Sequence, residues 1–286
     1  MDVVIVSGIS VGSMYAIMAL GLVLEYRFSR VLNLAHGGQA VLAAYTFNAT
    51  RGAGRGLAFV LGVAVAGISG LLIEFLVGER LRRSSEFIKM LGTLGFLLAL
   101  VGGVKAIWGG VYVQVPSLVS PQTLAIGGVR ISYDQLLLAF VGAAVSISVI
   151  VALKYTALGI RVRAVGERPV LAETLGVDSV RLARQLWTVG GMVAGIAGIL
   201  VMPILNLDVV VYSLIVITAY SAVLIGGMEN VGRAALGGLL IGLIQALANY
   251  KVHVIGVPEA TVLAVALVVL LLAGSKLSWT EREEAV

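Results

Sequence analysis

The chain of 286 residues is too apolar for a soluble globular protein, because 59% of it is hydrophobic and only 12% is charged. Its net charge of +5 therefore bears on membrane topology before it bears on nucleic-acid binding, and we expect no nucleic-acid partner. The absence of cysteine excludes disulfides, thiolate metal sites and cysteine nucleophiles. These observations predict an all-α polytopic membrane protein, with one integral membrane domain over residues 1–286.

Nine apolar segments, separated by polar clusters, are the candidate membrane helices. Several of them reach the roughly 20 residues that a bilayer requires. The segments at 32–49 and 234–250 are shorter and rich in glycine, so for them a re-entrant or broken helix stands beside a full span. We therefore expect about eight to nine transmembrane or re-entrant helices. In chain order the segments cover about residues 3–24, 32–49, 57–78, 88–108, 134–153, 182–205, 209–228, 234–250 and 258–274.

The lysine and arginine residues predict the orientation. If residues 154–184 are cytoplasmic, strict alternation places fifteen of the twenty basic residues inside and five outside. The opposite orientation inverts this ratio. We therefore expect the N-terminus outside and the C-terminus in the cytoplasm, with Arg51 and Arg55 as local exceptions.

Small residues at four-residue spacing predict close packing between helix backbones. They recur at Gly8 and Gly12; Gly62, Ala66 and Gly70; Gly190, Ala194 and Gly198; and Gly238, Gly242 and Ala246. Residues 33–38 and 233–238 also resemble each other, since each stretch ends in Gly-Gly and opens a short helix. This similarity indicates either a parallel repeat around a central pathway or chance.

The polar stretch at 154–184 contains one short helix signal, because Pro169 precedes an apolar run and Gly176 follows it. Such a helix is amphipathic, with Glu173 on the solvated side. Its apolar face consists of Val170, Leu171, Thr174 and Leu175. This face either docks into a groove of a partner or rests on the chain's own membrane domain.

Groups that could supply energy or catalysis are scarce. The sequence has no phosphate-binding loop of the Gly-x-x-x-x-Gly-Lys-[Ser/Thr] type, no HExxH and no Gly-x-Ser-x-Gly. Within the apolar segments the ionisable candidates are Glu74, Lys105 and His36, and the second histidine, His253, is predicted on the opposite side. A membrane pathway without its own energy source indicates a subunit driven by a partner, and an ion-coupled secondary transporter is the alternative from another class.

Four blocks of sequence carry a family resemblance. They are GSMYAIMALGL at 12–22; VLNLAHG at 31–37, followed by Ala44 and Tyr45; Arg163-Ala164 with LGVD at 175–178; and AVLIGG at 222–227 with AALGG at 234–238. In this combination and spacing the chain resembles the permease subunits of Liv-type ABC importers, which carry branched-chain and other hydrophobic amino acids. The same type of importer for urea, short amides or another small solute remains open.

The resemblance implies a subunit that is not itself an enzyme and lies in a prokaryotic inner membrane. Its implied partners are a second permease subunit (identical or related), two cytoplasmic ATPases that bind the ATP, and an extracytoplasmic solute-binding protein; the chain itself would need no cofactor and no metal. The residues implied in coupling to the ATPases are Pro169, Val170, Leu171, Ala172, Glu173, Thr174, Leu175 and Gly176. Those expected along the translocation pathway are Asn33, His36, Gly37, Gly226, Gly227, Gly237 and Gly238.

Overall fold

The structure is a computed structural model, and it describes residues 2–110, 112–126, 129–228, 230–252, 260–269 and 271. The elements in this part of the chain are α1 (Asp2–Ser29), α2 (His36–Thr50), η1 (Arg51–Ala53), α3 (Arg55–Ile73), the π-helical turn η2 (Glu74–Glu79), α4 (Glu86–Trp108), β1 (Thr123–Ile126), β2 (Val129–Ser132), α5 (Tyr133–Tyr155), α6 (Ala157–Glu167), α7 (Pro169–Thr174), α8 (Ser179–Leu205), α9 (Val209–Gly226) and α10 (Val231–Lys251). A further short helix covers Ala260–Val269.

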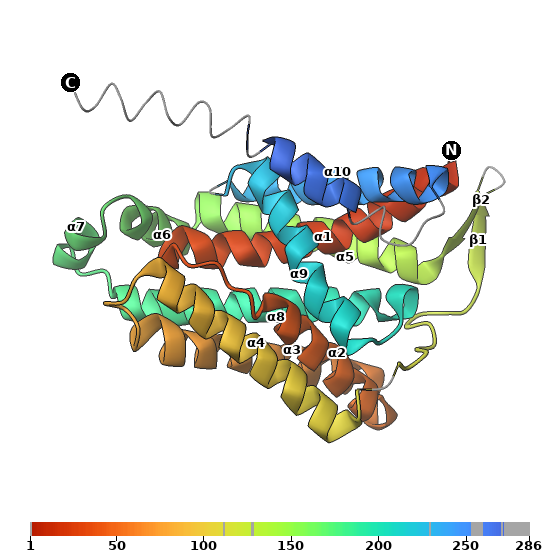
Figure 1. Ribbon diagram of the computed structural model, residues 1–286, viewed down its shortest axis with the longest axis horizontal. Helices are drawn as coiled ribbons and strands as arrows, with labels where there is room; N and C mark the ends of the chain where they lie inside the picture. Colours follow the sequence, from red (N-terminus) through yellow and green to blue (C-terminus); the bar gives the residue numbers. More distant parts are fainter. Residues whose placement is uncertain are drawn as a thin grey trace.

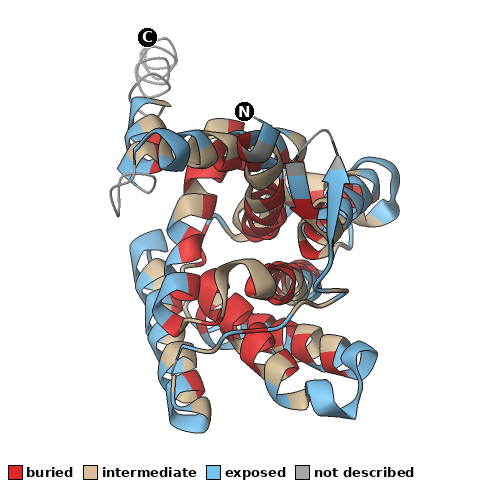
Figure 2. Ribbon diagram, turned by 90° about the vertical axis from the view of Figure 1, so that its right-hand side faces the viewer, coloured by how far each residue is buried: buried red, intermediate tan, exposed pale blue. Residues whose placement is uncertain are grey.

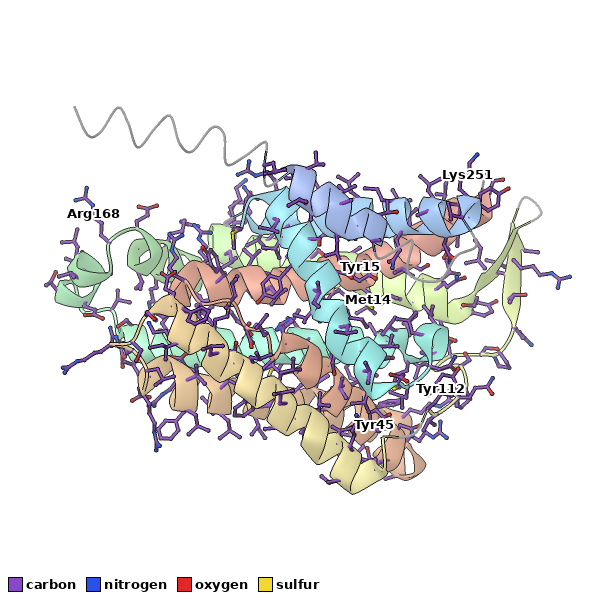
Figure 3. The ribbon with its side chains drawn as sticks, viewed as in Figure 1. Met14, Tyr15, Tyr45, Tyr112, Arg168 and Lys251 are labelled. Carbon is purple, nitrogen blue, oxygen red and sulfur yellow. The ribbon has the colours of Figure 1, made fainter. Side chains whose placement is uncertain are left out.

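The long helices form an elongated bundle with two distinct ends (Figure 1). Helices α6 and α7 lie at one end, here called the α7 end, and the antiparallel hairpin β1–β2 lies at the other, the hairpin end (Figure 1). Arg168 and Lys251 mark these opposite ends (Figure 3). Within the polar stretch at 154–184, a second helix, α6, precedes the predicted short helix.

Seven of the described helices are long and apolar enough to cross a membrane. One of them is α10, an unbroken helix of 21 residues, so a full span is the alternative that holds for segment 234–250. Helix α2 has only 15 residues and is about 22 Å long, short of the roughly 30 Å hydrocarbon core. The predicted segment 258–274 is described only at 260–269 and 271, and its remainder lies outside the described residues, as does His253.

The connection between α1 and α2 explains why α2 is short. Helix α1 ends at Ser29, and Arg30 adopts a positive φ of 55°. Residues 31–35 then run back from the α7 end into the bundle, where α2 begins (Figure 1). The chain thus has non-helical backbone inside the bundle, which is tolerated where it is buried in protein.

Close helix packing at small residues is confirmed. Helix α1 crosses α10 where Gly12 faces Gly242, and a Cβ on Gly242 would lie 2.3 Å from the Gly12 backbone. Helix α3 meets α8 in the same way, because a Cβ on Gly70 would lie 2.1 Å from the carbonyl of Trp187. Buried residues line the inner faces of the helices (Figure 2). Of the seven spans, α4 and α5 are the least buried. Helix α1 is the most buried of the seven spans, and it contacts α5, α8, α9 and α10.

Candidate functional site

Helix α7 (Pro169–Thr174) has the start and the stop that the sequence predicts. Gly176 has a left-handed φ of +88°, and its amide donates to the carbonyl of Glu173 at 3.0 Å. The amide of Val177 donates to the carbonyl of Ala172, also at 3.0 Å. These two bonds form a Schellman closure, which satisfies carbonyls that the helix end would otherwise leave free. The left-handed backbone, and not lack of space, calls for glycine at 176, since nothing lies within 4 Å of a Cβ there.

The apolar face of α7 has no cover within the described chain. Val170 is 76% exposed, Leu175 77% and Leu171 50%, whereas Ala172 is only 3% exposed and anchors the helix. An open cavity of about 410 Å³ lies beside Val170 and Leu171. Of the two alternatives for this face, contact with the chain's own membrane domain is therefore not observed, and the face is left available to a partner.

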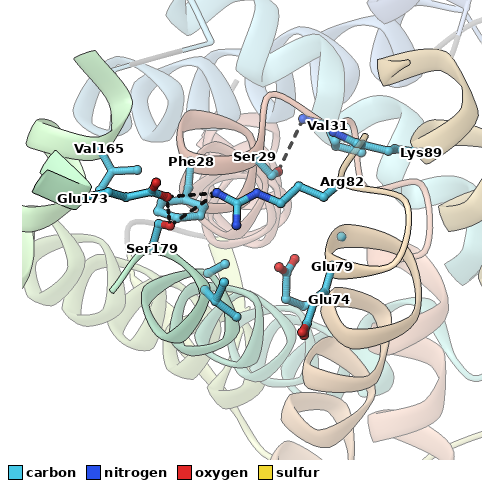
Figure 4. A pocket seen from close by; sticks show the side chains of 13 residues that line it. Phe28, Ser29, Val31, Glu74, Glu79, Arg82, Lys89, Val165, Glu173 and Ser179 are labelled. Carbon is cyan, nitrogen blue, oxygen red and sulfur yellow. Dashed lines mark hydrogen bonds and ion pairs between the residues drawn. The ribbon is translucent and has the colours of Figure 1, made fainter. Parts of the chain in front are cut away.

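Glu173 ties α7 to the bundle. Its side chain remains 42% exposed, but it accepts hydrogen bonds from Nη2 of Arg82 at 2.9 Å and from the hydroxyl of Ser179 (Figure 4). The bond from Ser179 and then that from Arg82 hold the pKa of the Glu173 carboxyl below its usual value. Glu173 is therefore not simply solvated, as the sequence suggested. It joins α7 to the turn after η2 and to the start of α8.

A second ion pair lies beside this one. Arg184 donates through Nη2 to Oε2 of Glu79 at 2.7 Å, which joins α8 to η2. The guanidinium of Arg80 instead lies 5.1 Å from the centre of the Phe75 ring. Arg80 therefore does not pair with Glu74, which is buried.

At the start of α2 the structure assembles a buried polar cluster, defined here as Glu25, Asn33, His36 and Gln39, each at most 1% exposed. Asn33 donates through Nδ2 to Oε2 of Glu25 at 2.8 Å. Nδ1 of His36 lies 3.5 Å from Oε1 of the same carboxylate. A break in helical structure therefore separates α1 from α2 at residues 30–35, and a carboxylate from α1 holds it.

The non-helical backbone of the break is also hydrogen-bonded. Oδ1 of Asn33 accepts from the amide of Ala35 at 3.0 Å. From α4, Thr93 accepts from the amide of Leu34 at 3.2 Å and donates to the carbonyl of Leu32 at 3.1 Å. Because buried backbone groups must be paired, these side chains make the non-helical stretch stable at this depth.

Glycines give the cluster its space. A Cβ on Gly21 would lie 2.5 Å from the His36 ring, and one on Gly190 would lie 2.2 Å from Oε1 of Glu25. Gly37 lies against the carbonyl of Ser213 in α9, which a Cβ would approach to 2.5 Å. The cluster therefore lies in the tightly packed contact of α1, α2, α8 and α9, and it is not an open channel within the single chain.

The remaining predicted pathway residues lie elsewhere. Gly226 and Gly237 are at the contact between α9 and α10, Gly227 ends α9 with a φ of +77°, and Gly238 packs on the backbone of Ala16. Gly226 and Ser213 are 13 residues apart on α9, a separation of about 20 Å. The structure therefore does not bring Gly226 and Gly37 together, and the place of these glycines along a pathway stays a prediction.

Sequence reasoning missed Glu25, because it lies just beyond the end assigned to the first apolar segment, 3–24. Tyr26, Arg27 and the following polar residues make the position read as a loop. In the structure α1 continues to Ser29, which carries Glu25 inside the bundle. The useful signal is that a polar residue within one turn of a segment end can still be part of the span.

The apolar helices and this arrangement define a multi-pass membrane protein. The solved structure described as PsaBC from Streptococcus pneumoniae in complex with Fab has a related fold, with a TM-score of 0.50 and 13% identity over 95% of this chain and 89% of that one. At this identity the likeness concerns the fold alone.

Sequence comparisons identify the family. The model for the permease component of the branched-chain amino acid transport system matches residues 4–274. The probable branched-chain amino acid transport permease LivH of Methanocaldococcus jannaschii is 30% identical over 83% of this chain and 78% of its own length. The permease BraD of Pseudomonas aeruginosa is 28% identical over 94% of this chain and 92% of its own, and LivH of Escherichia coli is 24% identical over 85% and 84%. The chain belongs to this family of transport permeases, which confirms the resemblance to Liv-type ABC permeases.

Proposed function

We propose that this permease is the membrane subunit of an ATP-driven importer for branched-chain or other hydrophobic amino acids. The names of its relatives support the substrate class. The exposed apolar face of α7 supports the energy source, because it offers a docking surface for the ATPase subunits that would bind the ATP. The chain would then need no cofactor of its own, and catalysis would belong to those partners.

The energetics of α7 carry the proposal. Burying Val170, Leu171 or Leu175 in a groove contributes roughly 1.5 to 3 kcal/mol for each side chain. Leaving all three in water forgoes that stabilisation on a helix whose geometry is otherwise fixed. The anchors are Ala172 inside, the closure at Gly176, and the Glu173 hydrogen bonds. A docked ATPase would thus move α7 as a rigid element and not as a flexible loop.

Movement of α7 would pass directly to the membrane helices. The Arg82–Glu173 pair links α7 to the turn between η2 and α4, and Ser179 links it to α8. In this mechanism closure of the ATPases pushes α7, and the spans swing from inward-open to outward-open as rigid bodies. A second permease, identical or related, completes the pathway, and a solute-binding protein delivers substrate at the hairpin end.

The proposed topology places the α7 end in the cytoplasm and the N-terminus outside. The count of basic residues supports this orientation, and α7 and the N-terminus lie at opposite ends of the bundle (Figure 1). The chain has no cysteine, so Thr174→Cys introduces a single label site on the exposed face of α7. A membrane-impermeant thiol reagent should label it in inside-out vesicles and spare it in intact cells. The reverse pattern contradicts the topology.

The decisive experiment reconstitutes the permease with its ATPases and binding protein in vesicles and measures uptake of labelled leucine. We expect uptake only with ATP, and competition by other hydrophobic amino acids. Uptake driven by an ion gradient without ATP would make the protein a secondary transporter. Competition by urea or short amides, but not by amino acids, would assign a different substrate to the same machine.

A further inference from the structure

A cavity of about 270 Å³ lies at the α7 end, between the end of α1, η2, the start of α4, α6, α7 and α8 (Figure 4). Its size is just below the roughly 300 Å³ at which small-molecule sites typically begin, so it suits a ligand of few heavy atoms. Within the described chain, it is distinct from the buried polar cluster, since none of the four cluster residues lines it.

Two charges that line the cavity lack partners. Glu74 is only 6% exposed, and its Oε2 has no hydrogen-bond partner. In the part of the chain that the structure describes, no hydrogen bond or ion pair engages the ammonium of Lys89 either. A buried carboxyl oxygen without a hydrogen-bond partner calls for an explanation, and a ligand that supplies the donor is one.

The other charged groups on the wall are already paired. Glu79 binds Arg184, and Glu173 binds Arg82 and Ser179. Arg82 uses only Nη2 in its two contacts, and the planar guanidinium has further N–H donors for an additional acceptor. Among the described residues, the cavity thus has one unpaired carboxyl group, that of Glu74, and one unpaired ammonium group, that of Lys89, with the guanidinium of Arg82 on the same wall.

The rest of the wall is apolar, with Phe28, Val165 and Val180 among the lining residues. An inorganic cation would satisfy Glu74 and leave Lys89 unpaired, and an inorganic anion would do the opposite. A ligand that carries both charges and an apolar side chain satisfies all three parts of the wall.

We propose that this cavity binds a zwitterionic amino acid with an apolar side chain. The ligand's ammonium would bind Glu74, its carboxylate would bind Lys89 and Arg82, and its side chain would pack on Phe28, Val165 and Val180. The bound ligand would then bridge η2 and α4 to α7, the element proposed to couple transport to ATP. The identity of this ligand with the imported substrate, and its entry from the cytoplasm, rest on the proposed function. The binding of an amino acid in the cavity does not depend on that function.

The test measures binding of three ligands to the purified full-length permease in lipid nanodiscs. They are leucine, leucinamide without the carboxylate, and isocaproate without the ammonium group. Leucine should bind about tenfold or more tightly than either of the others, since each of them loses one charge-assisted contact. No binding of leucine to the wild-type protein overturns the proposal.

Two variants assign the charges. Lys89→Gln should lower the affinity for leucine about tenfold and leave the affinity for leucinamide unchanged. Glu74→Gln should lower the affinity for leucine by a similar factor and leave the affinity for isocaproate unchanged. Lys154→Gln is the matched control at the same end, because the Lys154 ammonium lies over the Tyr155 ring and not in the cavity; it should change none of the affinities. If Glu74→Gln does not fold, Lys89→Gln decides alone. Leucine binding that Lys89→Gln does not alter, or equal losses for leucine and leucinamide, overturn the assignment.

Uptake by the assembled importer separates this inference from the proposed function. If the complex imports leucine but its permease shows no leucine binding that depends on Lys89, only the proposed amino-acid site in the cavity is contradicted. If the permease binds leucine through Lys89 but the complex transports another solute, only the substrate class in the proposed function is contradicted.

Discussion

The buried polar cluster and helix α7 place their side chains in opposite ways. Glu25, Asn33 and His36 carry charge or hydrogen-bonding groups and are at most 1% exposed, whereas Val170 and Leu175 are apolar and more than 70% exposed. Within the cluster Asn33 donates to Glu25, and Nδ1 of His36 lies 3.5 Å from the same carboxylate, whereas the amide of Gln39 has no hydrogen-bond partner among the described residues. The apolar face of α7 has no cover among the described residues. The first region therefore holds the structure of one subunit, and the second has the character of an interface.

The largest effect should come from breaking the cluster. Glu25→Ala leaves Asn33 and His36 buried without their carboxylate, and removal of one partner from a buried pair costs about 3 to 5 kcal/mol. We expect a much lower midpoint of thermal unfolding in detergent. Glu25→Gln is the control, because its amide oxygen can still accept from Asn33, and it should lose less. An unchanged midpoint in Glu25→Ala would show that the cluster does not hold the break.

Leu171→Asp should affect helix α7, and its effect should be seen in transport and not in the stability of the permease. It removes the roughly 1.5 to 3 kcal/mol expected from burying Leu171 and adds the cost of desolvating a charge on docking. Uptake and the ATP hydrolysis stimulated by the binding protein should fall together, while the unfolding midpoint of the isolated permease stays the same. Leu171→Met keeps apolar volume and should couple normally. A Leu171→Asp complex with normal uptake would contradict the docking role.

A smaller loss is expected from Gly176→Val. The left-handed backbone at this position costs a residue with a Cβ about 1 to 2 kcal/mol, and a β-branched one is strained further. The orientation of α7 should change although its apolar face is intact, so uptake should fall. Gly176→Asn is the matched control, since asparagine adopts this conformation more readily. Equal uptake by both variants would argue against a need for the rigid stop.

The smallest effect concerns pH. Because the folded pKa of Glu173 is lowered, its contribution to holding α7 is present above the ordinary carboxyl pKa and is lost as the pH falls through the lowered value. Fluorescence anisotropy of a label on Thr174→Cys should stay constant down to the ordinary carboxyl value of about 4.5 and decrease only below it. With Glu173→Gln added, the anisotropy should be lower throughout and show no such step. A step that persists in that variant assigns it to another group.

The sequence predicts the features that depend on local rules. Pro169 and Gly176 set the limits of α7 because proline suits a first helical position and glycine a left-handed stop. The spans follow from apolar length, and the crossing at Gly12 follows from the spacing of small residues. Each of these features is decided within a few residues of the chain.

Features that depend on distant contacts could not be predicted. The role of Glu25 requires the chain to turn back after Ser29 so that Asn33 meets the carboxylate, and no local pattern specifies that return. The cavity at the α7 end likewise joins residues far apart in sequence, such as Lys89 and Val180. The sequence also left open whether segment 234–250 is a full span or a broken helix, and distant contacts decide this, since the glycines of α10 serve contact with α1 and do not break the helix.

The crossing of α1 and α10 also sets an order of events during synthesis. Gly12 and Gly242 are 230 residues apart, so at about 5 to 20 residues per second the ribosome needs roughly 10 to 50 seconds to supply the second after the first. Throughout that time the glycine face of α1 lies in the bilayer without its native neighbour. A newly made permease is therefore exposed to wrong helix pairing longest at its N-terminal helix, and a chain interrupted before α10 would keep that face open for insertion factors and membrane proteases to recognise.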